Sequence, residues 1–311
     1  MSSIELNKFI QKSAENLGFS KVGFAKAQTH LESQLKLSSW IDNGYHATMD
    51  WIPKRSTERG DILKYYPKAK SVISLGFNYF TGNTSNKKNS GKLSNYAWGD
   101  DYHNLIKSKL YQLLIDIKLY QDDINGIVCV DTSPIMEKDW AQKAGLGWIG
   151  KHTNLISRDF GSWIFLAEII LDIELEYDQP FIEDLCGTCT ACLDNCPTNA
   201  FPKPYVLDAN KCISYLTIEH RDSLPSEMID KLSGWIYGCD ICQEVCPWNI
   251  KFSQLSNEEG FQARSDLQSR QLSVWNSLTE EEFKILFKNS AVKRTKFKGL
   301  KRNITHNLPK N

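Results

Sequence analysis

Cys186-Gly-Thr-Cys189-Thr-Ala-Cys192-Leu-Asp-Asn-Cys196-Pro197 follows the spacing C-x2-C-x2-C-x3-C-P. This is the bacterial ferredoxin signature, in which the fourth cysteine ligates the other cluster of a pair. Three thiolates on one tight loop can reach three corners of a four-iron cube. The fourth, after a longer gap, points away from that cube, so the run predicts two clusters and not one.

A second run, Cys239-Asp-Ile-Cys242-Gln-Glu-Val-Cys246-Pro247, repeats the spacing C-x2-C-x3-C-P, and Cys212 stands between the two runs. Eight cysteines are enough for two 4Fe–4S clusters. The chain departs from a plain ferredoxin because Cys212 replaces the first cysteine of the second run at a much larger distance. By the cross-over rule, the first cluster takes Cys186, Cys189, Cys192 and Cys246, and the second takes Cys196, Cys212, Cys239 and Cys242.

Two other uses of these cysteines are weaker. Zinc prefers four ligands from two separated C-x2-C pairs, which leaves the third cysteine of the first run and both Cys-Pro endings unexplained. Disulfides need an oxidising compartment, and nothing in the sequence suggests export.

The N-terminal residues lack the apolar core of a signal peptide, and the most apolar run, Trp163–Ile173, is too short to span a bilayer. We therefore expect a soluble, cytoplasmic protein that does not enter a membrane.

The charges of the 311-residue chain balance overall, with 37 basic and 37 acidic side chains, but they are unevenly placed. From Lys284 to Asn311 there are nine Lys or Arg and no Asp or Glu. Such a tail suits a polyanion. From charge alone, a solvated basic terminus explains it equally well.

Helices and strands alternate along the first 180 residues, which predicts an α/β domain. One expected strand ends in Asp131, and a carboxylate there is well placed to line a site at a sheet's edge. Cys129, inside that strand, is interpreted as a small core residue and not as a ninth ligand. The expected helices are residues 4–17, 31–42, 104–120 and 135–144, and the expected strands are 19–25, 71–79, 126–131 and 161–172.

The remaining segments are less regular. Residues 55–66 and 81–94 are typical of polar connections. Between the cysteine runs we expect helices at 210–220 and 225–237. Near the C-terminus Thr279 precedes three glutamates, which predicts an N-cap and a helix through Lys288.

An electron carrier needs far fewer residues than the 180 or so that precede the clusters. The clusters are therefore expected to feed a redox centre or a substrate in the first domain. A G-x-G-x-x-G dinucleotide fingerprint and a P-loop are both missing from the sequence. Spacing alone does not name the cofactor.

Several segments resemble the epoxyqueuosine reductase family, which is cobalamin-dependent and related to the reductive dehalogenases. They occur in the family's order over most of the chain, together with the cysteine pattern. The segments are Pro67-Lys-Ala-Lys-Ser-Val-Ile, Tyr96-Ala-Trp-Gly-Asp-Asp-Tyr-His103, Val130-Asp-Thr-Ser-Pro134, Ala144-Gly-Leu-Gly-Trp-Ile-Gly-Lys151, Cys212-Ile-Ser-Tyr-Leu-Thr with Arg221, and Tyr237 to Pro247.

The resemblance implies a fold of mixed α/β (α+β) class in three parts. Residues 1–180 would form a nitroreductase-like domain that holds cobalamin, residues 181–250 a ferredoxin-like domain with two 4Fe–4S clusters, and residues 251–311 a short helical, basic segment that contacts tRNA. It also implies the reaction, in which electrons from an external one-electron donor pass through the clusters to cobalamin. Epoxyqueuosine at the wobble position of tRNA is thereby reduced to queuosine by a monomeric enzyme.

The resemblance implies roles for individual residues. Asp131 matches the family's catalytic acid, and we expect burial to raise its pKa for that role. A helix N-cap is the alternative role for the same side chain. The implied cobalamin contacts are Arg59, Tyr96, Trp98, Asp101, Tyr102, His103, Asp131, Gly147, Trp148 and Lys151, and the candidate tRNA contacts are Arg294, Lys301 and Arg302.

Three residue assignments and the class of function stay open. Arg55 is the alternative to Arg59 as the arginine that contacts cobalamin. His103 is as consistent with a polar pocket residue as with a cobalt ligand, and His152 stands where the family usually has asparagine. Two other functions are alternatives: a reductive dehalogenase-like enzyme acting on small molecules, and an iron–sulfur electron-transfer subunit without cobalamin.

Overall fold

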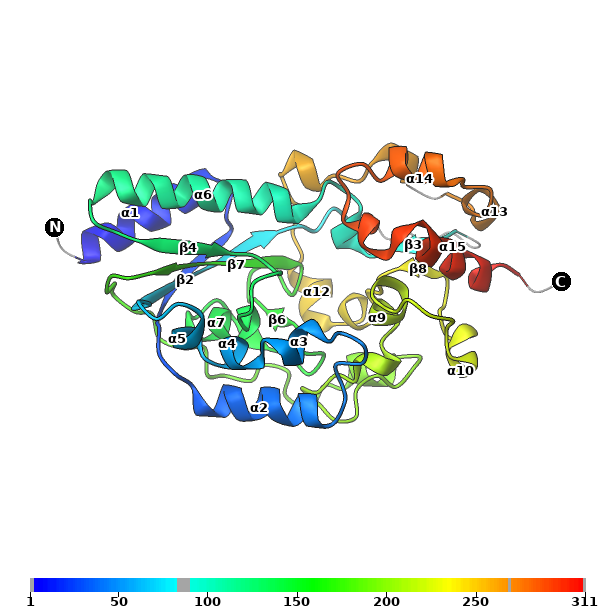
Figure 1. The fold of residues 1–311 in the computed structure, drawn as a ribbon, viewed down its shortest axis with the longest axis horizontal. Helices are drawn as coiled ribbons and strands as arrows, with labels where there is room; N and C mark the ends of the chain where they lie inside the picture. The colour runs from blue at the N-terminus through cyan, green and yellow to red at the C-terminus, as the bar shows by residue number, and fades with distance from the viewer. Residues whose placement is uncertain (1–2, 83–89, 268–269, 310–311) are drawn as a thin grey trace.

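The centre of the molecule is a four-stranded antiparallel sheet with the order β1-β2-β7-β4 (Figure 1). The structure is a computed structural model that describes residues 3–82, 90–267 and 270–309. The inner strands β2 and β7 are almost wholly buried, as their apolar runs predict. The strands are β1 (Lys21–Lys26), β2 (Ser71–Asn78), β4 (Gly126–Cys129) and β7 (Ile164–Leu171).

Helices cover both faces of this sheet (Figure 1). On one face, α1 (Ser3–Asn16) and α6 (Tyr102–Tyr120) pack side by side and bury Ile10 and Leu110 against the sheet. On the other face, α7 (Glu137–Lys143) buries Trp140. The same side carries α2 (Leu31–Asp42), α3 (Trp51–Lys54), α4 (Ser56–Gly60) and α5 (Ile62–Tyr65).

The mixed helix-and-sheet class is confirmed, but two expectations for this half differ in detail. The alternating helices and strands do not build parallel βαβ units, because every pair of neighbours in the central sheet is antiparallel. The stretch expected as a polar connection, residues 55–66, contains α4 and α5. Asp61 explains the second of these helices, because its side chain accepts a hydrogen bond from the backbone of Leu63 and caps α5.

The cysteine region is built from short helices on one side of the molecule. The helix expected at 225–237 is wrong beyond its first turn, because the chain passes through left-handed conformations at Ser233 and Gly234 and then forms a strand. That strand, β8 (Trp235–Tyr237), pairs in parallel with β3 (Lys92–Leu93). The helices are α8 (Ala191–Asp194), α9 (Ile213–Ile218), α10 (Ser226–Ile229), α11 (Ile241–Glu244) and α12 (Pro247–Phe252).

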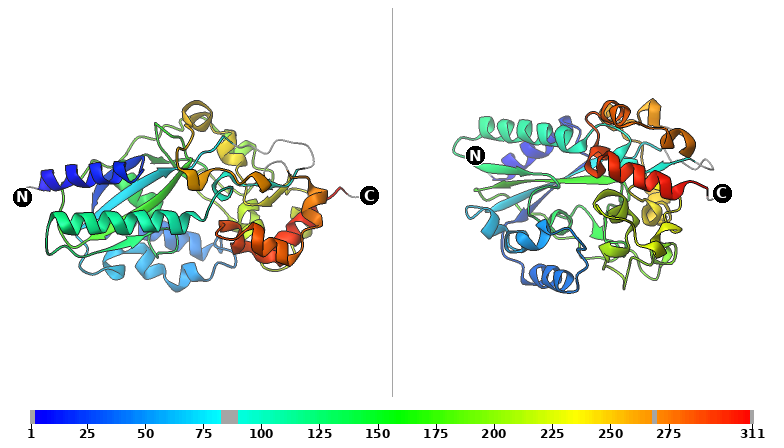
Figure 2. Two further views of the ribbon diagram at one scale, coloured as in Figure 1. Left: turned by 90° about the horizontal axis from the view of Figure 1, so that it is seen from above. Right: turned by 45° about the vertical axis from the view of Figure 1, so that its right-hand side comes forward.

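The C-terminal segment packs at the end of the molecule opposite the N-terminus (Figure 2). Thr279 forms a complete capping box with Glu282 at the start of α14 (Glu280–Leu286), which confirms the predicted cap. The helix expected through Lys288 ends at Leu286, two residues earlier. A further helix, α15 (Lys296–Asn307), lies within the segment that was expected to be helical and basic, although its bounds were not predicted. The remaining elements are α13 (Leu272–Asn276), the hairpin of β5 (Trp148–Ile149) and β6 (Leu155–Ile156), and 3-10 helices η1 (Asn95–Ala97), η2 (Ala209–Lys211), η3 (Glu259–Phe261), η4 (Ser265–Leu267) and η5 (Ala291–Thr295).

The segment from Ser90 to Trp98 joins the first part of the chain to the last. Leu93 and Trp98 lie in a core that they share with Tyr237, Trp275 and Leu300. The three parts expected from the sequence therefore interlock, because a piece of the first is buried among side chains of the second and third. Across the described ranges, none of the helices is both long and apolar enough to cross a bilayer.

Asn303 provides a test of how α15 is attached. This side chain is fully buried, and its Nδ2 donates to the carbonyls of Thr217 (2.8 Å) and Ile236 (2.9 Å). We expect Asn303→Leu to lower the free energy of unfolding by about 1–3 kcal/mol, because the buried Ile236 carbonyl loses this donor. The Thr217 carbonyl still accepts a hydrogen bond from Thr295 Oγ1. Urea titration followed by circular dichroism measures the change. Lys298→Ala, at an exposed position of the same helix, is the control, and equal stability of the two variants would contradict the expectation.

Candidate active site and cysteine cavities

A cavity of about 340 Å³ lies where the end of the central sheet meets the cysteine region. We call it the main cavity. Its lining includes Tyr96, Tyr102 and Asp131, and also Cys212, Cys239 and Cys242. The structure therefore brings the candidate acid and three candidate cluster ligands to one space.

The backbone turns Asp131 out of the edge strand β4. Its φ is 53°, in the left-handed region that aspartate tolerates better than most residues. The backbone N–H of Asp131 donates to the carboxylate of Glu137, the first residue of α7. The alternative role as a helix N-cap is wrong, since Met136 occupies that position and Asp131 lies outside the helix.

His103 connects two carboxylates at the start of α6. Its Nδ1 lies 2.7 Å from Asp101 Oδ1, and its Nε2 lies 2.7 Å from Asp131 Oδ2. Burial acts against the charged ring, but hydrogen bonds to Asp101 and Asp131 outweigh it and raise the pKa of His103 to about 9. The ring is therefore an imidazolium at neutral pH. Both ring nitrogens of His103 are engaged by carboxylates in this arrangement.

The role of acid would need a raised pKa at Asp131, and in this structure the pKa is shifted in the opposite direction. Burial does raise it, but the hydrogen bond and the positive charge of His103 outweigh burial, so the pKa of Asp131 is lowered. The acidic proton of the pair is therefore held on His103. The half-exposed Asp131 carboxylate faces it.

Glu137 was missed by sequence reasoning. Burial, and next the negative charge of Asp131, raise the pKa of the Glu137 carboxyl. It lines the main cavity and fixes the Asp131 backbone. The sequence feature that could have identified Glu137 is its position in the first turn of the helix after Asp131. A carboxylate is stabilised at that position by the helix dipole.

The aromatic wall of the main cavity is tightly packed. Tyr102 stacks on Phe165 with ring centroids 4.2 Å apart, and also on the His103 ring at 4.0 Å. The hydroxyl of Tyr96 donates to that of Tyr237. These contacts hold the His103–Asp131 pair against the end of the sheet.

A second cavity, of about 180 Å³, contains the first predicted cysteine set. Leu185, Ile156 and Trp248 form its apolar lining. Burial, and next the charges of Cys186 and Cys246, raise the pKa of the Cys192 thiol to about 11. All four members of the set line this cavity: Cys186, Cys189, Cys192 and Cys246.

The second predicted set gathers beside the main cavity. Cys196 does not line the cavity, but its charge acts on both Cys212 and Cys242. Cys239 is likewise influenced by Cys242 and Cys212. The ninth cysteine, Cys129, lies apart in the core, as expected, and burial raises its pKa to about 12.

Several predicted cofactor contacts lie away from the main cavity. Trp98 and Trp148 are each only 1% exposed and belong to cores. A Cβ on Gly147 would stand 2.1 Å from the carbonyl oxygen of Ile156, so this glycine serves the β5–β6 hairpin. Lys151 Nζ donates to the carbonyls of Gly187 (2.5 Å) and Cys189 (2.9 Å) and holds the first cysteine loop.

Arg59 and Asp101 do not line the main cavity, but each interacts with residues of the site. Arg59 is half-buried, donates to the Ile135 carbonyl at 3.1 Å and feels the charges of Glu137 and Asp131. Asp101 caps α6 and orients His103.

The three candidate tRNA contacts have protein partners. Arg302 donates to the carbonyls of Leu216 (2.7 Å), His220 (3.0 Å) and Asp222 (2.6 Å). Lys301 Nζ donates to the Asn276 carbonyl. Arg294 forms a bidentate pair with Glu219, and its guanidinium remains half-exposed.

Comparison with known proteins bears on this arrangement. Residues 59–132 match a family model described as "Epoxyqueuosine reductase QueG, DUF1730", and residues 185–249 match one described as "4Fe-4S double cluster binding domain". The epoxyqueuosine reductase of Cyclobacterium marinum is 44% identical over 98% of this chain and 97% of its own length. That of Escherichia coli is 40% identical over 94% of this chain and 78% of its own length.

Solved structures agree. A crystal structure of epoxyqueuosine reductase with an epoxyqueuosine-modified tRNA-Tyr stem loop has a TM-score of 0.90 at 30% identity, covering 99% of this chain and 82% of the other. The Bacillus subtilis enzyme, solved with its catalytic aspartate loop swung out of the active site, has a TM-score of 0.89 at 28% identity over the same shares of the two chains. With relatives at this identity along nearly its whole length, the chain belongs to the epoxyqueuosine reductase family.

Proposed function

We propose that this protein reduces epoxyqueuosine to queuosine at the wobble position of tRNA. The observation that carries the proposal is the main cavity, whose lining includes Asp131, the partner of His103, together with Cys212, Cys239 and Cys242. A proton source and an electron source thus meet in one space. Loss of an epoxide oxygen as water consumes two electrons and two protons, so both sources are needed.

The two cysteine sets are proposed as the ligands of two 4Fe–4S clusters. The cavity around Cys186, Cys189, Cys192 and Cys246 is closed by apolar side chains, and Lys151 fixes its loop. The set of Cys196, Cys212, Cys239 and Cys242 is the one that borders the main cavity. The charge of Cys192 acts on Cys242, which brings the two sets into electrostatic range of one another.

The main cavity fits part of a cobalamin in chemical character. Its wall of Tyr102, Phe165 and Leu166 suits a flat, mostly apolar face. His152 Nε2 is buried without a hydrogen-bond partner among the described residues and is available to a side-chain amide. When bound, the clusters carry single electrons and cobalamin supplies a reducible cobalt centre. Tyr96, Tyr102, His152 and Asp131 are the residues that would hold it here.

His103 and Asp131 are proposed to deliver the proton. Epoxide opening leaves an alkoxide, which a positioned acid within hydrogen-bond reach can protonate. The imidazolium of His103 holds the proton. Asp131, whose side chain is half-exposed, relays the proton from His103 to the alkoxide. Glu137 keeps the Asp131 backbone in place. The electrons come from an external one-electron donor, and the working unit is proposed to be a monomer.

The first test is conversion of the substrate, with Asp131→Asn as the matched variant. Protein reconstituted anaerobically with iron, sulfide and cobalamin is given a reductant and tRNA that carries epoxyqueuosine. Mass spectrometry of the digested tRNA should show queuosine. Asp131→Asn should lower turnover by about 10²-fold or more, since general acid catalysis contributes about 10²–10⁴-fold.

Iron content and the corrin absorbance of this variant should equal those of the wild type. Unchanged turnover in Asp131→Asn would remove Asp131 from the mechanism. Lack of conversion by the fully loaded wild type would overturn the proposed function itself.

The pH dependence of kcat/KM tests the place of the proton. The raised pKa keeps His103 protonated up to about pH 9, so the rate should fall as the pH rises through about 9. His103→Gln keeps a hydrogen-bonding side chain but cannot hold the proton. We expect it to be slower and to lack this alkaline limb. The same limb in the variant would assign the titration to another group.

The cluster assignment is tested by Cys196→Ser. Removing one ligand of the second set should lower the iron content to about half and abolish one of the two cluster signals in electron paramagnetic resonance, while the first cluster stays. Cys129→Ser, in the core, is the control and should retain all iron. Loss of both clusters, or of neither, in Cys196→Ser would contradict the assignment.

A further inference from the structure

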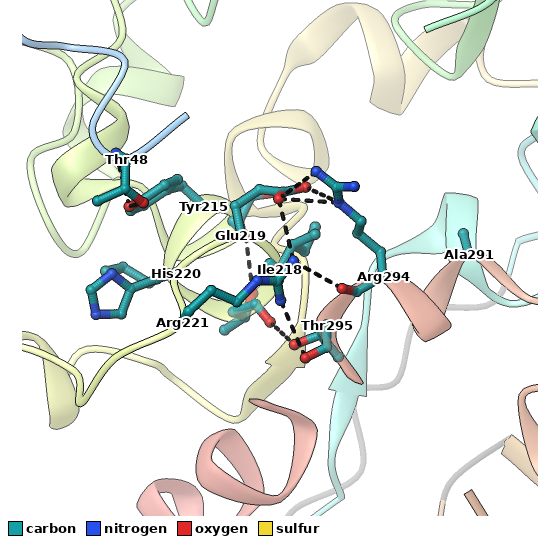
Figure 3. Close-up of polar contacts among 12 residues, drawn as sticks. Thr48, Tyr215, Ile218, Glu219, His220, Arg221, Ala291, Arg294 and Thr295 are labelled. Carbon is teal, nitrogen blue, oxygen red and sulfur yellow. Dashed lines mark hydrogen bonds and ion pairs between the residues drawn. The ribbon is translucent and has the colours of Figure 1, made fainter. Parts of the chain in front are cut away.

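A third cavity, of about 410 Å³, opens on the surface where three segments meet. We call it the basic cavity. Residues 48–51, residues 219–221 and residues 293–296 form it, and Figure 3 shows part of this meeting. Its lining includes Trp51, Glu219, Arg221, Lys293, Arg294 and Lys296.

Glu219 organises the two arginines of this cavity (Figure 3). Its side chain is only 17% exposed, and its carboxylate accepts from Arg294 Nε at 2.8 Å and Nη2 at 2.9 Å. Arg221 lies 3.6 Å from the same carboxylate and donates to the carbonyls of Arg294 (3.0 Å) and Thr295 (3.3 Å). Both guanidinium groups are therefore fixed by the protein.

The two lysines are not fixed in this way. Lys293 and Lys296 are exposed, and within the described part of the chain neither has an ion pair or a side-chain hydrogen bond. Lys296 has a φ of 62°, a costly conformation for a residue with a side chain. The hydrogen bond from Thr295 Oγ1 to the Thr217 carbonyl anchors the residue just before it. Four cations against one carboxylate leave the basic cavity positive, which suits an anion.

Trp51 adds an aromatic surface to these charges. It is 44% exposed, and the guanidinium of Arg294 lies 5.1 Å from its ring centroid. Exposed aromatic rings beside lysine and arginine are the combination that binds single-stranded nucleic acid, because bases stack on the ring while the cations meet phosphates. A site for a free inorganic anion would not need an exposed tryptophan ring.

The basic cavity is connected to the active site through η5. Tyr96, in the wall of the main cavity, donates to Tyr237, and Tyr237 donates to the carbonyl of Ala291 at 2.8 Å. Arg294, three residues further on, is close enough for its charge to lower the pKa of Asp131. The two cavities are thus close enough for one nucleic-acid strand to enter both.

We propose that the basic cavity binds the nucleotide next to epoxyqueuosine in the anticodon loop. Its phosphate meets Lys293 and Lys296, and its base lies against Trp51. This subsite rests on the proposed function, because the main cavity must take the modified nucleotide. A phosphodiester is also present in the nucleotide tail of cobalamin, and the test separates these two sources.

The test for the phosphate is binding of a fluorescent anticodon stem–loop without epoxyqueuosine to the reconstituted enzyme at several salt concentrations. Lys293→Gln/Lys296→Gln should weaken binding about tenfold and lower the slope of log K against log salt by about 0.7 for one phosphate. Lys288→Gln/Lys298→Gln removes the same charge from exposed lysines outside the cavity and should keep the wild-type slope.

The test for the base uses Trp51. Trp51→Leu should weaken stem–loop binding by about tenfold, since stacking on an aromatic ring is lost. Trp51→Phe should restore most of it. In turnover with modified tRNA, both the lysine variant and Trp51→Leu should raise KM and leave kcat close to wild type.

Three outcomes decide the proposal. Wild-type conversion together with unchanged stem–loop binding in the lysine and Trp51→Leu variants overturns the subsite and leaves the proposed function standing. Weaker cobalamin binding in these variants, seen in corrin absorbance titrations, with RNA binding unchanged assigns the cavity to the cofactor and also overturns it. No conversion by the wild type overturns the proposed function and removes the basis of the subsite.

Discussion

The hydrogen bond of 2.7 Å between His103 Nε2 and Asp131 Oδ2 joins the first turn of α6 to the loop after the edge strand β4. One end belongs to a helix that covers one face of the sheet and the other to the loop after the edge strand, so the bond forms only when the helix lies on the sheet. Asp101 secures one end through His103 Nδ1, and Glu137 secures the other through the Asp131 backbone. The electrostatics of the site follow, because the imidazolium draws its stability from two carboxylates.

The rest of the fold keeps three cysteines in the same cavity as Asp131. The segment around Tyr96 lines the main cavity, and the same segment enters a core with Trp275 and Leu300 near the C-terminus. β3 and β8 pair just before the second cysteine run. The cysteine region is therefore attached to the sheet through buried side chains, and not through a flexible linker. Such an attachment can hold electron and proton sources in fixed relation.

The sequence allowed some of this to be predicted and not the rest, for a physical reason. The cysteine sets and Asp131 could be proposed from the sequence because short-range spacing and a strand end are local features. Glu137 was missed because its raised pKa depends on tertiary burial. The burial of Trp98 and the carbonyl contacts of Lys151 also depend on tertiary packing and could not be predicted from the sequence. Residues within a family motif can be packing or bracing residues, as the 1% exposure of Trp98 and the carbonyl contacts of Lys151 demonstrate.

The fold gives the arginines and the lysines of the basic tail different roles. Arginine presents several donors in a rigid fork, which suits several carbonyls at once. Arg302 uses this fork on three backbone carbonyls, and Arg221 uses it on η5. Lysine is a point charge on a flexible stem and serves a phosphate without a fixed geometry. The arginines that made the tail a candidate for nucleic acid thus build the surface, and Lys293 and Lys296 are left to meet the ligand.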